Sequence, residues 1–167
     1  MLCELQIKNL AVIDSMTIPI DSKYLSLIGE TGSGKSIIIS AISFLNGERC
    51  DYSLLRNKKE KGVVLGVFHL DSSFLLKHEE VKEYVDEEGT LIVKRVMNPD
   101  KTTRNYINGE PLSLLTLKQV MSHILSIHSQ NSNSDLFLSD KQLSYIDFYC
   151  GQEIVSIKKE YQDAFHC

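Results

Sequence analysis

Eight consecutive residues near the N-terminus have the types and the spacing of a phosphate-binding loop. They are Gly29-Glu30-Thr31-Gly32-Ser33-Gly34-Lys35-Ser36, which match the pattern G-x-x-x-x-G-K-[ST] in full. Glycine has no Cβ, so the backbone at positions 29, 32 and 34 can adopt positive φ and bring successive N–H groups close to phosphate oxygens. The helix expected to follow adds a partial positive charge at the same place. The motif therefore predicts a site for a nucleoside triphosphate.

Two side chains at the end of this loop have separate expected roles. Lys35 is a compact cation that should reach the β- and γ-phosphates, and it is the first candidate for catalysis. The hydroxyl of Ser36 should occupy one position on Mg²⁺, an ion that prefers octahedral oxygen ligands. Ile37 follows directly and completes the expected nucleotide-binding set. The sequence thus predicts a bound nucleotide with Mg²⁺ as its metal cofactor.

A second candidate residue for chemistry is Gln130, in a polar loop expected from residue 128 to residue 134. A glutamine at the end of a strand can offer its amide oxygen to Mg²⁺ or to an attacking water, but the spacing alone favours an ordinary polar loop residue. His123 and His128 lie close in sequence, but no carboxylate or cysteine stands near them at ligand spacing. The sequence therefore predicts no metal site at these histidines.

Three short strands are expected to precede the phosphate loop. Leu5, Ile7 and Leu10 with residues 11–13 form the first, residues 16–20 the second and residues 24–28 the third, with polar breaks at 14–15 and 21–23. After the loop, apolar residues recur at helical spacing up to Leu45, and Asn46-Gly47 provides a C-terminal stop. The order of strand, glycine-rich turn and helix indicates an α/β fold.

Further strands are expected at residues 62–70, 91–97 and 104–107. Asn108-Gly109 is the dipeptide favoured in hairpin turns with positive φ at both positions, and a helix is expected over residues 114–123. The basic residues from Arg56 to Lys61 fit either a DNA-contacting edge or a solvated loop. The acidic run from Glu79 to Glu88 is typical of a solvated face, and we assign it no function.

The last segment has an apolar seam of its own. Ile154, Ile157, Tyr161 and Ala164 recur at steps of three, four and three, a pattern shared by coiled coils and by ordinary amphipathic helices. We expect residues 1–150 to form one lobe and residues 151–167 to begin a coiled-coil helix.

Composition limits the classes of partner. The 167 residues carry 18 Lys and Arg against 22 Asp and Glu, a formal net charge of −4, so there is no overall cationic field for nucleic acid. No apolar run approaches the roughly 18–20 residues needed to cross a bilayer, and the N-terminus lacks the features of a signal peptide. The four cysteines form no C-x-x-C pair. We expect a cytoplasmic protein with no membrane partner, disulfide framework or zinc site.

Four segments together carry a resemblance to a known family. They are Leu5 to Asp14, the loop from Gly29 to Ile37, Tyr106 to Pro111 and the Ile127 to Gln130 segment. In this order they resemble the RecN family, bacterial DNA repair proteins of the SMC-like branch of the ABC-type ATPases. The resemblance runs through nearly all of this chain and covers the N-terminal part of the family's length.

The resemblance implies a P-loop NTPase fold, namely lobe I of an ABC-type ATPase head with a mixed sheet and the start of a coiled coil. By position, Gly29 to Ser36 match the ATP loop and Gln130 matches the glutamine of the Q-loop, where it would act in catalysis and on the metal. Arg56 stands where related heads place a basic residue near nucleotide or DNA. Implied partners are ATP, a second head lobe (the protein's own C-terminal half or one in trans), a second head and DNA, with nucleoid association and a role in recombinational double-strand-break repair.

The residues that complete such a head are not seen in this sequence. No hydrophobic strand ending in Asp-Glu and no signature motif follows Gln130, and phosphoryl transfer of this class needs a carboxylate and a partner head. We therefore expect ATP binding without hydrolysis by this chain alone. Two alternatives remain open: a transporter-type ABC subunit, and a non-enzymatic binding or dimerisation module from a truncated or split gene.

Overall fold

The computed structural model describes residues 1–30, 34–49 and 51–127, together with the single residues 142, 154, 157, 161, 164 and 165. The chain divides into two compact units, Met1–Ser126 and Ile127–Cys167. The first unit contains every strand that the structure describes. The expected division into residues 1–150 and 151–167 stays a prediction.

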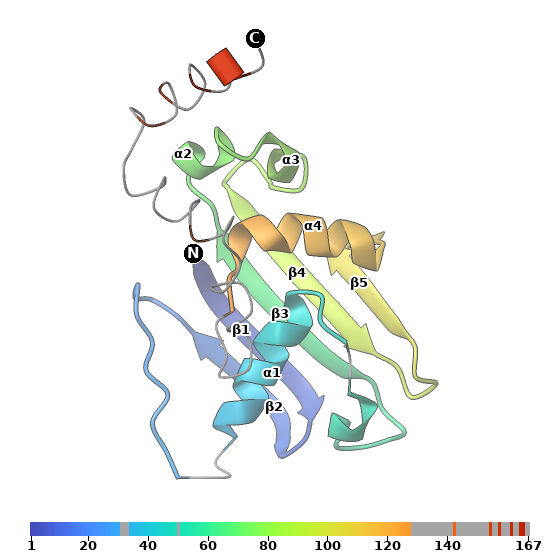
Figure 1. The fold of residues 1–167 in the computed structure, drawn as a ribbon. Coiled ribbons are helices and arrows are strands. Elements are labelled where there is room, and N and C mark those ends of the chain that lie inside the picture. The colour runs from blue at the N-terminus through green and yellow to red at the C-terminus, as the bar shows by residue number, and fades with distance from the viewer. Residues whose placement is uncertain are drawn as a thin grey trace. The chain divides into compact units, whose positions relative to one another are not determined.

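Six strands form one sheet in the first unit (Figure 1). They are β1 (Leu2–Leu10), β2 (Ile13–Pro19), β3 (Gly62–His69), β4 (Thr90–Met97), β5 (Thr103–Ile107) and β6 (Glu110–Leu112). Their order across the sheet is β2-β1-β3-β4-β5-β6, and each neighbouring pair is antiparallel. The mixed sheet implied by the family resemblance is thus not found among the described strands.

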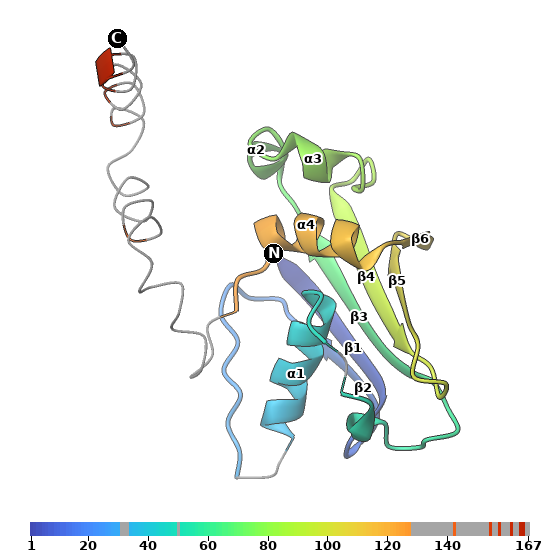
Figure 2. The ribbon, with the colours of Figure 1, turned by 45° about the vertical axis from the view of Figure 1, so that its right-hand side comes forward.

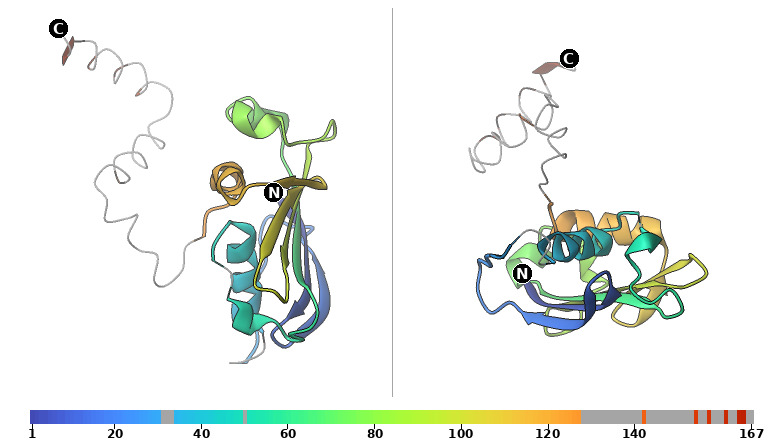
Figure 3. Two further views of the ribbon diagram at one scale, coloured as in Figure 1. Left: turned by 90° about the vertical axis from the view of Figure 1, so that its right-hand side faces the viewer. Right: turned by 90° about the horizontal axis from the view of Figure 1, so that it is seen from below.

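Two long helices cover one face of this sheet. They are α1 (Lys35–Leu45) and α4 (Leu114–Ile124), which lie on the same side of the strands in Figures 2 and 3. Apolar residues alternate along the strands, so that Leu5 and Ile7 of β1 and Val64 and Phe68 of β3 are buried. The helices bring Ala41, Leu45, Leu117 and Met121, each buried, to the same core. This arrangement fixes α1, and with it the end of the phosphate loop, on the sheet.

The chain reversals differ in part from the expected ones. Asp14 and Ser15 lie inside β2, and the break between β1 and β2 falls at residues 11–12, where Ala11 has a φ of 50°. The predicted turn at Asn108-Gly109 is confirmed, with φ of 46° and 89°. Because the first turn uses alanine, which rarely adopts positive φ, its position could not be read from turn residues.

Short helices fill the connections. They are η1 (Tyr52–Leu54), α2 (Ser72–Leu75) and α3 (Glu79–Lys82). The acidic run expected to be a solvated face contains α3, and Val81 in this helix is fully buried in the core. The acidic run is therefore only partly solvated, since Val81 packs one face of α3 against the hydrophobic core.

The expected strand over residues 24–28 is not formed. This segment has no strand pairing, and Tyr24 and Ile28 are 81% and 92% exposed. An open cleft of about 310 Å³, lined among others by Leu25, Leu27, Ile38 and Ile42, lies between the segment and the core. An apolar segment forms a stable strand only beside a partner strand, and none of the described strands pairs with this one.

The expected coiled-coil seam falls in the second unit. Ile154, Ile157, Tyr161 and Ala164 are each helical, and Ile157 and Tyr161 are largely exposed. The coiled coil itself stays a prediction. None of the helices in the described part of the chain has the length and apolar character needed to cross a lipid bilayer.

Candidate functional site

The phosphate loop ends where α1 begins. Gly34 is the N-cap of the helix with a φ of 97° and a ψ of −1°, and its carbonyl accepts hydrogen bonds from the N–H groups of Ile37 (3.0 Å) and Ile38 (3.1 Å). The predicted positive φ is confirmed at Gly34, while Gly29 is not among the described residues with positive φ. Thr31, Gly32 and Ser33 lie outside the described residues. The N-terminal end of α1, with its partial positive charge, directly follows the loop.

The side chain of Lys35 reaches back across the loop. Its Nζ donates hydrogen bonds to the backbone carbonyls of Gly29 and Glu30, the latter at 2.6 Å. The ammonium therefore joins the two ends of the loop. A phosphate group that enters the loop offers stronger, charged acceptors in place of these carbonyls.

Ser36 and Ile37 have opposite environments on the first turn of α1. Ser36 is exposed, and its backbone carbonyl accepts a hydrogen bond of 2.8 Å from the Ser40 hydroxyl. Ile37 is half-buried against the core, and its N–H already donates to Gly34. The hydroxyl of Ser36 is therefore accessible to a metal ion, whereas the side chain of Ile37 faces the protein.

Arg56 lies close to the phosphate loop through the turn at residues 11–12. Its Nη1 donates a hydrogen bond of 3.0 Å to the carbonyl of Val12. A Cγ of Val12 would be 3.8 Å from a Cβ placed on Gly34, so the turn contacts the end of the loop. The structure thus links Arg56 to the loop end of α1 through Val12, and its role near nucleotide or DNA stays a prediction.

Asn9, which the sequence did not single out, holds the basic segment in place. This residue is 3% exposed, and its Nδ2 donates to the carbonyls of Asn57 (3.0 Å) and Glu60 (3.1 Å). Its Oδ1 accepts from the N–H of Asn57 at 2.7 Å. Three hydrogen bonds from one buried amide fix the loop that carries Arg56. Asn9 has a φ of 55°, a backbone conformation that asparagine adopts more readily than most residues.

Asn9→Leu is expected to destabilise the protein by about 2 to 3 kcal/mol, because a buried apolar side chain leaves these backbone groups without partners. The free energy of unfolding from urea titration measures the effect. Gln6→Leu serves as the matched change, since Gln6 is an exposed amide side chain of the same strand. A loss of less than about 0.5 kcal/mol for Asn9→Leu would show that the network does not stabilise the loop.

The lysines at positions 58, 59 and 61 have different environments. Nζ of Lys58 donates to the carbonyls of Tyr52 and Ser53, each at 3.1 Å, and so caps the short helix η1. At the start of η1, a side-chain hydrogen bond from Ser53, followed by its backbone N–H, lowers the pKa of Asp51. Lys59 and Lys61 are exposed. Lys58 therefore has a structural role, which leaves Arg56, Lys59 and Lys61 as cations for a ligand.

The other end of α1 is held by a buried arginine. Arg95 of β4 is 1% exposed, and its Nη1 donates to the carbonyls of Phe44 and Glu48, the latter at 3.0 Å. Its Nε donates to Oδ1 of Asn105 at 2.8 Å, and its guanidinium lies 3.9 Å from the centre of the Phe44 ring. A cation at the C-terminal end of a helix complements the helix dipole. Arg95 thus fixes the phosphate-loop helix to the sheet.

The remaining predicted site residue, Gln130, lies outside the described residues. The helix before it, α4, starts at the N-cap Ser113, whose hydroxyl accepts from the N–H of Thr116 at 3.0 Å, and ends at Ile124. Leu125 is extended with a φ of −130° and a ψ of 120°.

Comparisons with known proteins bear on the same residues. The family model described as AAA domain matches residues 4–165. The DNA repair protein RecN of Vibrio cholerae is 32% identical over 151 residues, which are 90% of this chain and 27% of that protein. RecN of Bacillus subtilis is 32% identical over 166 residues, 99% of this chain and 29% of that protein. The chain thus spans less than a third of the length of these relatives.

Solved structures share the fold. A structure from a study of ATP-driven dimerization and DNA-stimulated activation of SMC ATPases has a TM-score of 0.62 at 16% identity and covers 88% of this chain and 98% of its own. RecF with a bound ATP analogue has a TM-score of 0.55 at 16% identity and covers 70% of this chain and 29% of its own. The predicted α/β fold of a P-loop ATPase head lobe is confirmed. The chain belongs to the AAA domain family and is related to the N-terminal part of RecN.

Proposed function

We propose that this chain is the ATP-binding N-terminal part of a RecN-like DNA repair ATPase that acts in recombinational double-strand-break repair. The observation that supports ATP binding most directly is the start of α1 at Lys35, immediately after Gly34, with the Lys35 ammonium turned into the loop. Related proteins are named for DNA repair. A phosphate loop serves triphosphate binding irrespective of the process that uses it.

In this proposal the backbone of Gly29 to Ser36 surrounds the phosphates. Lys35 exchanges its two carbonyl partners for β- and γ-phosphate oxygens, and the exposed Ser36 hydroxyl binds the Mg²⁺ that accompanies ATP. Gln130 would offer its amide oxygen to the same Mg²⁺ or to the attacking water. Arg56 adds a positive charge beside the loop through its bond to Val12.

The site needs a second lobe for hydrolysis, supplied by the protein's own C-terminal half or in trans. The exposed segment 24–28 supports this proposal, because its apolar residues lead directly into the loop and lack a strand partner among the described residues. An Asp or Glu that polarises water would come from that lobe. The chain by itself is expected to bind ATP weakly and to turn it over negligibly.

Head-to-head dimerisation and DNA binding complete the proposal. The SMC study with the similar structure describes ATP-driven dimerization and DNA stimulation of those proteins. In this chain Lys59 and Lys61 are exposed cations near Arg56 and are the proposed DNA contacts. We propose that the protein works in the cytoplasm at the nucleoid. A transporter-type subunit is not favoured, since both curated relatives above are RecN proteins.

Isothermal titration of the chain with ATP, ADP and adenosine in Mg²⁺ buffer tests the proposal. Because the loop recognises phosphates, affinity should fall from ATP to ADP, and adenosine should give no measurable heat. Equal affinity for adenosine and ATP would contradict a phosphate-directed site.

Ser36→Ala is expected to reduce the dependence of ATP affinity on Mg²⁺. The exposed hydroxyl supplies one metal ligand, so its removal should bring the affinity in Mg²⁺ close to the value in EDTA. Titrations of both proteins in each buffer measure the ratio. Ser40→Ala is the control, because its hydroxyl is hydrogen-bonded within α1. An unchanged ratio in Ser36→Ala would remove Ser36 from the metal site.

A further inference from the structure

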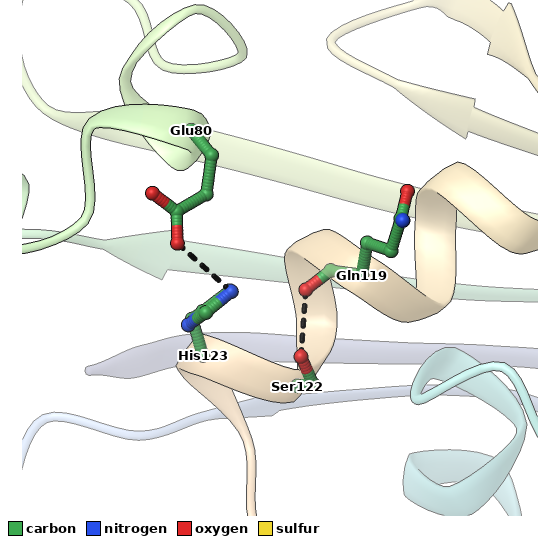
Figure 4. Close-up of polar contacts among 4 residues, drawn as sticks. All are labelled: Glu80, Gln119, Ser122 and His123. Atoms are coloured by element: carbon green, nitrogen blue, oxygen red, sulfur yellow. Dashed lines mark hydrogen bonds and ion pairs between the residues drawn. The ribbon is translucent and has the colours of Figure 1, made fainter. Parts of the chain in front are cut away.

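Two histidines and a glutamate meet on the surface between α3 and α4, outside the nucleotide site. His78 precedes α3, Glu80 lies in its first turn, and His123 stands in the last turn of α4. Nε2 of His123 lies 3.0 Å from Oε1 of Glu80. Figure 4 draws this contact between the two side chains. One potential ligand atom from each of the three residues lies within 4.8 Å of the others. This is a set of three metal-binding side chains that the linear sequence does not reveal.

The two elements that carry the cluster are fixed by the core. Val81 of α3 and Met121 of α4 are fully buried, so the backbones beside the three ligands are held. The ring of His78 contacts the rings of Phe74 and His123, with centroids 4.5 and 4.9 Å apart. The side chains of His123 and Glu80 are 32% and 59% exposed. The backbone that carries the cluster is therefore held by the core, while the ligand atoms of His123 and Glu80 are accessible to ions from solvent.

The two imidazoles and the carboxylate of this cluster favour one class of metal ion. Imidazole nitrogens suit zinc, copper and nickel, whereas magnesium and calcium prefer a shell of oxygens. Zinc binds nitrogen and carboxylate oxygen at about 2.0 to 2.2 Å, which places neighbouring donors about 3 to 3.5 Å apart. The distance of 3.0 Å between His123 and Glu80 already fits this spacing. A nitrogen of His78 lies within 4.8 Å of both of these atoms, so a reorientation of its ring would complete a three-ligand shell, with water in the remaining position.

The ion pair between His123 and Glu80 does not include His78, the third residue of the cluster. Glu80 and His123 pair with each other, whereas the His78 ring packs against the rings of Phe74 and His123 beside this pair. The side chain of His78 also does not cap α3, although it occupies the N-cap position. We propose that His78, Glu80 and His123 bind a divalent transition-metal ion of the zinc type, which links α3 to the C-terminal end of α4.

Metal titration of the full chain without nucleotide tests the proposal. Zn²⁺ binding is followed by calorimetry, and Co²⁺ binding by its visible absorption, because cobalt reports the ligand type. His78→Ala and His123→Ala are each expected to lower zinc affinity at least tenfold, and Glu80→Gln to lower it severalfold. His69→Ala is the matched control, since His69 is an exposed histidine outside the cluster, and it should keep the affinity of the unchanged chain.

The ligand set also predicts the spectrum. Cobalt should give absorption bands of a nitrogen and oxygen site without the intense charge-transfer band of a thiolate. Equal zinc affinity in the unchanged chain and in His78→Ala or His123→Ala would overturn the proposal, as would a thiolate band in the cobalt complex. Glu80→Gln keeps the shape of an exposed side chain, so an unchanged affinity in this variant would equally contradict the site. Because no nucleotide is present, these outcomes are independent of ATP binding.

Discussion

Lys35→Ala is expected to abolish measurable ATP binding. The ammonium is the one side-chain cation of the loop motif, and it already lies inside the loop against the carbonyls of Gly29 and Glu30. Charge-assisted hydrogen bonds contribute about 1.5 to 3 kcal/mol each, so the loss of Lys35 weakens triphosphate binding roughly a hundredfold. For a chain that binds weakly, this places the affinity beyond detection by calorimetry.

Lys8→Ala is the matched control for this change. Lys8 is an exposed lysine of β1, outside the loop, and its replacement should leave ATP affinity unchanged. Thermal unfolding of Lys35→Ala checks that the chain remains folded. Equal ATP affinities of the unchanged chain and Lys35→Ala would refute the assignment of the phosphate loop.

Arg95→Met should lower the free energy of unfolding by about 3 to 5 kcal/mol. Methionine fills much of the volume but donates no hydrogen bond, so the carbonyl of Glu48 and the Oδ1 of Asn105 lose their Arg95 donor, and the carbonyl of Phe44 keeps only the N–H of Gly47. Each unsatisfied buried acceptor costs about 1 to 3 kcal/mol. Since the carbonyls of Phe44 and Glu48 lie at the C-terminal end of α1, the change also loosens the helix that carries the phosphate loop.

Urea titration of the chain measures the effect, with Arg104→Met as the control. Arg104 lies on the neighbouring strand β5 but is exposed, and a surface change of this kind is expected to stay within about 0.5 kcal/mol. A similar small loss for Arg95→Met would show that the buried guanidinium does not anchor α1.

Local signals in the sequence were sufficient for several parts of the fold. The glycines and the apolar spacing after them predicted α1 and its end at Asn46-Gly47, because caps and helical periodicity are local properties. Asn108-Gly109 predicted the hairpin turn for the same reason. The loop motif likewise located Lys35 and Ser36, since the chemistry of phosphate binding depends on residues that are consecutive in the chain.

Features that depend on distant residues were missed or misjudged. The segment 24–28 has the composition of a strand, but pairing is a non-local property and no described strand lies beside it. The contact of 3.0 Å between His123 and Glu80 was not predicted, because the two residues are far apart in sequence and only α3 brings them together. Arg95 was one residue in an expected strand, and its role arises only where α1 ends above β4.

Hydrogen exchange of the backbone amides with and without Mg-ATP tests the central claim most directly, because it locates the nucleotide on the chain. The account predicts slower exchange in the segment from Gly29 to Ile38, where the loop and the first turn of α1 would donate to phosphates, and no change in β4 and β5. Saturating Mg-ATP that leaves exchange in this segment unchanged, or that protects only other parts of the chain, would contradict the claim that this loop binds the nucleotide.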